Sequence, residues 1–183
     1  MSHPAVWRFG DEIGPVREAV RAGRIVAIPT ESSYGLAVDP RNDAAVRSVF
    51  DLKGRPSGEP LPVVVGDERQ IEALGGSLED PLLRRLAELW PAAISLLVPI
   101  AEPLAAAAGS GHLACRIPDH GALRRLLLDL GTGLTATSAN PSGSAALTDP
   151  QRVAELLRRA PGSVLIDDGV LAGGNPSTLV GVR

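Results

Sequence analysis

The chain has 183 residues, of which 44% are hydrophobic and 3% aromatic, and its formal net charge is -3 at pH 7. This length supports one well-buried aliphatic core, so we expect residues 1–183 to form a single domain. No apolar run approaches the roughly 20 residues of a membrane span, and the N-terminus lacks a signal-peptide region. We therefore expect a cytoplasmic protein without membrane contact. The charge argues against a generally basic surface that coats nucleic acid, while leaving room for a local basic patch.

Cysteine and histidine are too few to build a metal centre. Cys115 is the only cysteine, which excludes an intramolecular disulfide and a cysteine-based metal site. Alternation in its segment places Leu113, Cys115 and Ile117 on one face, so we interpret Cys115 as a core thiol. The three histidines have no spacing typical of a metal cluster. We therefore predict no protein-bound metal.

The first part of the chain predicts an edge strand, a helix and a buried strand. Residues 5–9 fit the edge strand, and Asp11 is the expected start of a helix that Gly23 stops. The apolar run 25–28 predicts a buried strand. Polar side chains follow it at once, where an open α/β sheet usually has its ligand crevice. These residues are Thr30, Glu31, Ser32, Ser33 and Tyr34.

The next helix, with Asp43 as its expected cap, ends in the sequence KGRP at residues 53–56. Lys53 stands out because it is the only lysine among 18 basic residues, and lysine and arginine are not interchangeable at anion sites. Pro56 favours an extended Arg55, and residues two apart in an extended segment share a face. Lys53 and Arg55 can therefore reach the same anion. The alternative is that the single lysine has no special role.

The middle of the chain predicts strands and helices in alternation. The apolar runs 61–65 and 94–98 predict buried strands, and Asp67 and Asp80 are expected to cap the two helices between them. The second of these helices should end before Pro91. Its predicted buried stripe is Leu82, Leu83, Leu86 and Leu89. The alanine-rich segment 104–110 is interpreted as a mobile connection.

Arg116 lies in the next predicted strand, residues 112–117, on the face opposite Cys115. Burying an arginine charge alone is costly, so such a residue needs a partner or a ligand. The spacing leaves a structural salt bridge and a substrate carboxylate equally open. A helix with Asp119 as its expected cap follows this strand.

A second polar segment, LTATSANP, covers residues 134–141. If it is extended, Ser138 and Asn140 share a face and present a hydroxyl and an amide side by side at the end of a strand. Asparagine before proline is also ordinary turn chemistry, so a simple turn is the alternative. A helix beginning at Thr148 or Asp149 and two strands, 163–167 and 177–180, complete the predicted α/β unit.

The glycine-rich segments match neither the Walker nor the dinucleotide-binding pattern. A nucleotide site in this chain would therefore have to be built from side-chain cations and hydroxyls. Several segments together resemble the threonylcarbamoyl-AMP synthase family, which has a YrdC-like domain, over roughly residues 13–180. They are PTESSYGLAVDP (29–40), KGRP (53–56), PL (60–61), TSANPSG (137–143) and NPST (175–178).

The resemblance implies a fold and an activity. The fold would be a single-domain YrdC-like α/β fold, with a twisted open mixed sheet flanked by helices and a concave ligand crevice. The activity would be that of a nucleotidyltransferase that condenses L-threonine, bicarbonate and ATP to threonylcarbamoyl-AMP and pyrophosphate. Its product would serve the threonylcarbamoyladenosine modification of tRNA. Mg²⁺ would accompany ATP, partner proteins would take the product to tRNA, and RNA contact is a further expectation.

The resemblance also implies roles for individual residues. The implied catalytic residues are Lys53, Arg55, Ser138 and Asn140. Lys53, Arg55 and Asn140 would also bind ATP, together with Thr148. L-threonine would be bound by Thr30, Arg116 and Ser177, with the arginine on the substrate carboxylate.

The chain departs from the family pattern at several positions. Ser32 stands where threonine is usual, residues 91–95 replace a PGP-x-T segment, and Glu59 stands where many members have asparagine. Family members often have an arginine after the NPST segment, and Arg183 is the candidate for that arginine in this chain. Two alternative functions remain: a relative that adenylates another carbamoyl or amino-acid substrate, as in hydrogenase maturation proteins, and a non-catalytic RNA-binding module.

Overall fold

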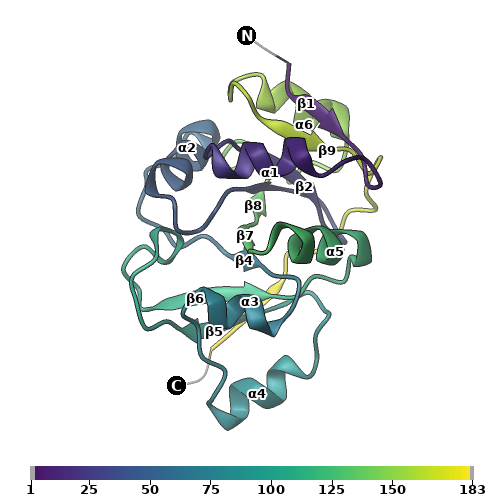
Figure 1. The fold of residues 1–183 in the computed structure, drawn as a ribbon. Helices are drawn as coiled ribbons and strands as arrows, with labels where there is room; N and C mark the ends of the chain where they lie inside the picture. The colour runs from purple at the N-terminus through teal and green to yellow at the C-terminus, as the bar shows by residue number, and fades with distance from the viewer. Residues whose placement is uncertain (1–2, 182–183) are drawn as a thin grey trace.

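The strands of the computed structural model, which describes residues 3–181, are divided between two five-stranded mixed sheets (Figure 1). Sheet A has the order β1 (Ala5–Trp7), β9 (Val164–Ile166), β2 (Val26–Pro29), β3 (Tyr34–Ala37) and β8 (Thr137–Ser138). Sheet B has the order β10 (Thr178–Val180), β5 (Ile94–Pro99), β6 (His112–Arg116), β4 (Val63–Val64) and β7 (Leu134–Thr135). The predicted mixed α/β fold is confirmed, with its strands in two sheets.

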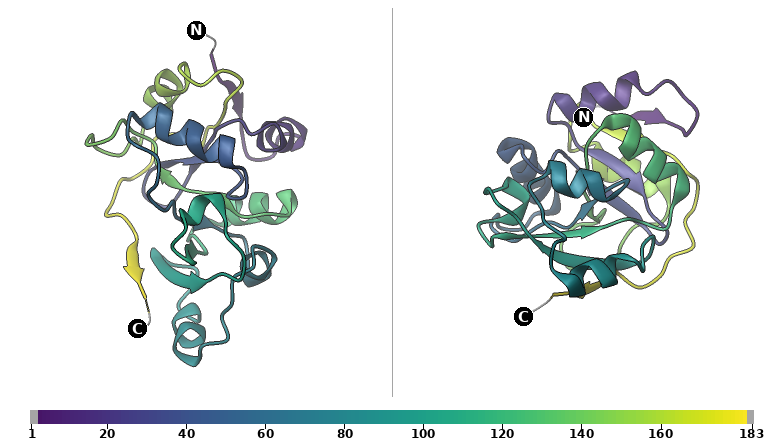
Figure 2. Two further views of the ribbon diagram at one scale, coloured as in Figure 1. Left: turned by 90° about the vertical axis from the view of Figure 1, so that its left-hand side faces the viewer. Right: turned by 60° about the horizontal axis from the view of Figure 1, so that its bottom comes forward.

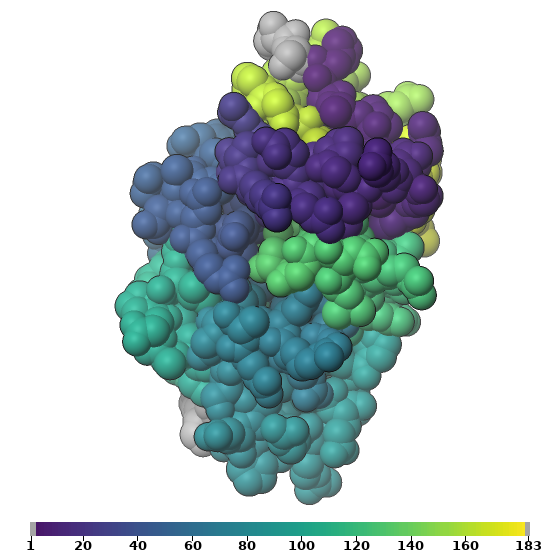
Figure 3. All heavy atoms as spheres, viewed as in Figure 1, coloured from purple at the N-terminus to yellow at the C-terminus, as the bar shows by residue number. Residues whose placement is uncertain are grey.

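The helices pack around these two sheets. They are α1 (Gly14–Arg21), α2 (Asp43–Lys53), α3 (Glu68–Ala73), α4 (Pro81–Ala87), α5 (Gly121–Leu130) and α6 (Pro150–Leu157). In Figure 1, α1, α2 and α6 lie with sheet A, α3 and α4 lie with sheet B, and α5 lies at the level between them. Figure 3 shows one face covered in turn by the N-terminal segment (purple), α5 (green) and the segment that contains α3 (blue). Among the described residues, no helix combines the length and apolarity needed to cross a membrane.

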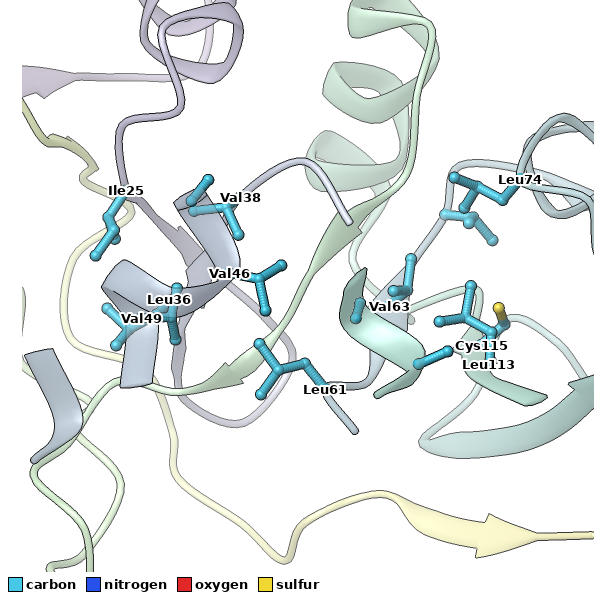
Figure 4. Close-up of a cluster of buried hydrophobic side chains, with 14 of the residues drawn as sticks. Ile25, Leu36, Val38, Val46, Val49, Leu61, Val63, Leu74, Leu113 and Cys115 are labelled. Atoms are coloured by element: carbon cyan, nitrogen blue, oxygen red, sulfur yellow. The ribbon is translucent and has the colours of Figure 1, made fainter. Parts of the chain in front are cut away.

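One hydrophobic cluster joins the two sheets. Its members include Leu36 from sheet A and Val63, Leu113 and Cys115 from sheet B, and Leu61 lies between these groups (Figure 4). Cys115 has no exposed surface, and burial raises the pKa of its thiol to about 12. The prediction that Cys115 is a core thiol is therefore confirmed.

The chain passes from sheet B to sheet A through a single residue, Ala136. β7 pairs with β4 in sheet B, and β8 pairs with β3 in sheet A, with Ala136 alone between β7 and β8. The hydroxyl of Thr135 accepts a hydrogen bond from the Val38 N–H at 3.0 Å, which ties this crossing to the end of β3. Of the two alternatives left open for this segment, the extended one holds up to Ser138, and the turn holds from Ala139 onward, where the chain bends. The crossing sets Ser138 and Asn140 at the junction of the sheets.

The C-terminal segment also connects the sheets. After β9 it leaves sheet A and runs along the molecule to the edge of sheet B, where it ends as β10 (yellow in Figure 2, left). β10 pairs in parallel with β5, and the pairing places Leu179 opposite Ser95. Ser177, which directly precedes β10, is brought in this way to the junction. Arg183, the candidate for a later arginine, lies outside the described residues.

Three predicted helix starts are wrong by one or more residues. Asn42, and not Asp43, caps α2, because its side chain accepts a backbone N–H of the first turn at 3.0 Å. His120 does the same for α5 at 3.2 Å, in place of Asp119. Asp11 lies three positions before the first residue of α1, and its carboxylate instead accepts the Arg8 N–H at 2.8 Å. The predicted caps Asp67, Asp80 and Asp149 are confirmed.

Two predictions in the middle of the chain are also wrong. α4 ends at Ala87 and buries Leu83, while Leu82 and Leu89 are 51% and 54% exposed. Leu89 lies beyond the end of the helix, and Leu82, about 100° around the helix from Leu83, faces away from the core. Residues 105–107 of the expected mobile connection form a 3₁₀ helix, in which Ala106 and Ala107 are buried. The Ala106 carbonyl accepts the Leu61 N–H at 2.8 Å, so this turn is fixed against the segment before β4.

Candidate active site

A pocket of about 190 Å³ lies where the two sheets meet. Four predicted site residues line it: Thr30, Arg116, Ser138 and Ser177. Thr30 follows β2, Ser138 ends β8, Arg116 ends β6 and Ser177 precedes β10. The pocket is therefore assembled from four segments that are distant in sequence, and two of them belong to each sheet.

Lys53 is joined to this pocket through Ser138. Its Nζ donates to the Ser138 carbonyl at 2.5 Å, to the Asn140 carbonyl at 3.1 Å and to Asn140 Oδ1 at 2.8 Å. The Ser138 hydroxyl donates to the same Asn140 Oδ1 at 2.7 Å. The structure thus brings together three predicted catalytic residues, Lys53, Ser138 and Asn140. The three N–H donors of the lysine ammonium group hold the segment that follows β8 in place.

The backbone at the end of α2 explains how Lys53 reaches this position. Lys53 is the last residue of α2, and Gly54 ends the helix in the left-handed conformation with φ 66°. The lysine side chain is buried, with 5% of the residue exposed. Burial, and secondarily the positive charge of Arg55, lower the pKa of Lys53 to about 8. A bound anion would oppose both effects and favour the charged form.

If Lys53 binds ATP, as the resemblance implies, the affinity for ATP should fall as the pH rises through about 8, the pKa of Lys53 in the free protein. Below this pH the ammonium group is charged and attracts the phosphates, and above it the neutral amine does not. We expect the Kd for ATP, measured by calorimetry without threonine or bicarbonate, to rise by about tenfold per pH unit above the pKa. Lys53→Met should remove this dependence, and an unchanged wild-type Kd across the range would exclude Lys53 from ATP binding.

Arg55 lies beside Lys53 and is only lightly held. Its guanidinium stacks on the Phe50 ring at 5.0 Å, and Nη1 lies 3.2 Å from Glu59 Oε2. The Glu59 side chain is 69% exposed, and exposed ion pairs contribute about 0–1 kcal/mol. The Nε of Arg55 is buried without a hydrogen-bond partner. Arg55 is thus available to bind an anion. Glu59, one of the departures from the family pattern, would compete with that anion for Arg55.

Arg116 forms an ion pair with Glu31, in the loop between β2 and β3. Their side chains are 10% and 22% exposed, and the second carboxylate oxygen of Glu31, Oε2, is buried without a partner. The salt bridge that the spacing left open is thus present, with a partner from the loop that lines the pocket. Sequence reasoning did not assign Glu31. The only signal in the sequence was that Glu31 is the one acidic residue among the polar side chains that follow β2.

The remaining predicted site residues, Thr30, Ser177 and Thr148, have different surroundings. The Thr30 hydroxyl donates to the Ser33 carbonyl at 2.7 Å and so shapes the pocket loop. The hydroxyls of Ser177 and Ser95 lie 2.9 Å apart, which sequence reasoning also missed. Thr148 does not line the pocket, and its carbonyl accepts the Leu171 N–H at 2.9 Å.

The described residues contain no group of three or more histidine, cysteine, aspartate or glutamate side chains that could hold a metal ion. An Mg²⁺ ion at this site would have to be held mainly by phosphate oxygens and water. That arrangement is usual for Mg²⁺ at nucleotide sites, where proteins contribute only one or two carboxylates. The residues present are therefore compatible with an ion that arrives with ATP.

The fold and the site define a mixed α/β protein with a concave crevice that holds buried cations at the junction of two sheets. The Sua5/YciO/YrdC family model, described as telomere recombination, matches residues 18–183. The chain belongs to this family, and the resemblance found in its motifs is confirmed.

Named relatives agree with this membership. A threonylcarbamoyl-AMP synthase of Bacillus subtilis is 34% identical over 174 residues, which are 92% of this chain and 49% of that protein. One of Chromohalobacter salexigens is 36% identical over 174 residues, which are 92% of this chain and 91% of that protein. The chain thus spans about half the length of the first relative and nearly all of the second.

A solved structure matches the whole arrangement. The crystal structure of P. abyssi Sua5 complexed with L-threonine superposes with a TM-score of 0.83 and 28% identity. The match covers 99% of this chain and 54% of that one.

Proposed function

We propose that this protein is an L-threonylcarbamoyladenylate synthase, an enzyme that joins L-threonine, bicarbonate and ATP. The names of the relatives and the threonine complex of P. abyssi Sua5 support the amino acid and the use of ATP. The observation that carries the proposal is the position of Ser138. Its carbonyl accepts a hydrogen bond from Lys53, and the same residue lines the pocket of Arg116. Ser138 thus connects two cations, Lys53 and Arg116. A reaction that brings anionic groups of different substrates together needs cations close to one another.

The chemistry needs these cations. The α-ammonium group of threonine first loses a proton to solvent. The neutral amine then adds to bicarbonate with loss of water, which gives a carbamate. A carbamate oxygen then attacks the α-phosphorus of ATP, the bond to the β-phosphate breaks, and pyrophosphate leaves. Preorganised positive charge stabilises the negative charge that shifts during such a transfer. We assign Lys53 and Arg55 to the phosphates and the carbamate, with Ser138 and Asn140 completing the catalytic site.

The pocket of Arg116 has the size expected for the amino acid. Its volume of about 190 Å³ lies below the range of roughly 300–1,000 Å³ typical of sites for larger ligands. We assign Arg116 to the threonine carboxylate, and Thr30 and Ser177 to its remaining polar groups. The nucleotide would lie on the other side of Ser138, toward Lys53, with Thr148 at its far end.

The proposal includes the wider setting of the reaction. We treat residues 1–183 as one domain, supported by the hydrophobic cluster that joins both sheets. Mg²⁺ would enter with ATP, and the product would pass to partner proteins that modify tRNA. ATP, L-threonine and tRNA occur together in the cytoplasm, where we place the reaction.

Pyrophosphate release from ATP tests the proposal. We expect release to require both bicarbonate and L-threonine, and L-valine to be about 10,000-fold poorer, because it lacks the hydroxyl and leaves polar groups of the pocket unpaired. Reactions without amino acid, and in buffer freed of carbon dioxide, are the controls. Release that is independent of threonine would favour a relative with another substrate. Complete inactivity, with salt-sensitive binding of RNA, would favour the non-catalytic RNA-binding module.

A further inference from the structure

The pair of Glu31 and Arg116 places a negative and a positive charge side by side at the amino-acid pocket. Arg116 lines the pocket, and so do Thr30 and Ser32, which flank Glu31 in the chain. The two charged side chains come from different sheets, Glu31 from the β2–β3 loop and Arg116 from the end of β6. The ion pair therefore lies at the junction of the two sheets.

The hydrogen bonding of Glu31 is incomplete in this state. One carboxylate oxygen pairs with Arg116, while Oε2 is buried and has no hydrogen-bond donor among residues 3–181. A buried acceptor without a donor is unfavourable, and more so when it is charged. Glu31 does not itself line the pocket but stands between its lining residues Thr30 and Ser32, so a donor on a ligand in the pocket could reach this oxygen.

An amino acid carries the complementary pair of charges. Its carboxylate matches Arg116, and its ammonium group, one carbon away, has three donors for a carboxylate. We propose that Glu31 binds the α-ammonium group of the amino-acid substrate while Arg116 binds its carboxylate. This inference rests on the proposed function and adds to it the group that distinguishes an amino acid from other small carboxylates.

The pairing in the free protein has a consequence for selectivity. Glu31 already occupies the guanidinium of Arg116, so an incoming carboxylate has to compete with it. An amino acid offers Glu31 an ammonium group in exchange. A carboxylic acid without an amino group offers nothing, and it leaves the displaced Glu31 carboxylate unpaired.

The test compares L-threonine with 3-hydroxybutanoate, which is threonine without its amino group. Both are titrated calorimetrically into the wild-type chain, Glu31→Gln and Glu31→Asp. We expect Glu31→Gln to weaken L-threonine by about 30-fold or more, the loss of a charge-assisted contact, while 3-hydroxybutanoate binds equally well or better. Glu31→Asp keeps the charge and should keep the preference for L-threonine.

The ratio of the two dissociation constants within one variant decides the question, because it does not depend on the fraction of folded protein. Glu72→Gln, which removes an exposed carboxylate on α3, should leave the ratio unchanged. If Glu31→Gln weakens both ligands equally, or neither, Glu31 only supports Arg116 or is not involved, and the inference is wrong. If the wild-type chain binds no L-threonine, the proposed function fails as well.

Discussion

Replacement of Lys53 by methionine is expected to lower the rate of pyrophosphate release by about 1,000-fold or more, the upper range for loss of one preorganised transition-state contact. Lys53 is the buried cation nearest to Ser138 and Asn140, and methionine fills a similar volume without charge. Arginine should not restore the rate. Its planar fork cannot reproduce three donors directed from one nitrogen at oxygens 2.5–3.1 Å away.

The control for this experiment lies on the same helix. Arg47→Met removes one exposed charge from α2 and should leave the rate unchanged. Lys53→Met should keep an unfolding midpoint within about 5 °C of the wild type, because losing the hydrogen bonds is offset by no longer burying a charge. A much larger drop would show that Lys53 mainly holds the segment after β8 in place, and would remove the case for a direct role in catalysis.

Replacement of Arg116 by methionine is expected to raise the KM for L-threonine by about 100-fold, while the KM for ATP changes by less than about threefold. In the proposed function the arginine is assigned to the amino-acid carboxylate, to which it would offer two parallel N–H groups, whereas Lys53 is assigned to the phosphates. Steady-state rates measured against each substrate in turn give the comparison. Equal increases in both KM values would contradict the assignment of Arg116 to the amino acid.

The same substitution should also destabilise the fold. It leaves the partly buried Glu31 carboxylate without its cation. Breaking a fully buried pair from one side costs about 3–5 kcal/mol, and we expect a smaller loss here because solvent reaches part of Glu31. Arg116→Met combined with Glu31→Gln should recover most of this stability in urea unfolding, because the uncompensated charge is gone. It should not recover threonine binding. The double variant thus separates the contribution of the pair to stability from its contribution to the substrate.

The sequence predicted the parts of the site that depend on local pattern. Lys53 was singled out by composition and by the helix end at Gly54, and Ser138 by the extended segment in which it lies. These inferences hold because a strand or a helix end fixes side-chain directions over a few residues. Arg116 was recognised as a buried charge in need of a partner for the same reason.

The parts that could not be predicted depend on contacts between distant segments. Glu31 meets Arg116 across 85 positions where the two sheets meet, and Ser95 meets Ser177 across 82 positions through the pairing of β5 with β10 inside sheet B. Local pattern also does not show that β7 and β8 belong to different sheets, although only Ala136 separates them. The errors at Asp43 and Asp119 have another cause. Asn42 and His120 stand directly beside them and also offer an acceptor to the first turn, and pattern alone does not choose between neighbours.

The buried thiol of Cys115 provides a natural reporter for this molecule. It lies next to Arg116 on the central part of sheet B, paired with both β5 and β4. With a pKa of about 12 and no exposed surface, it does not react with alkylating reagents while the sheet is closed. Because the chain has no other cysteine, the rate at which the unaltered protein is labelled measures how often sheet B opens beneath the pocket.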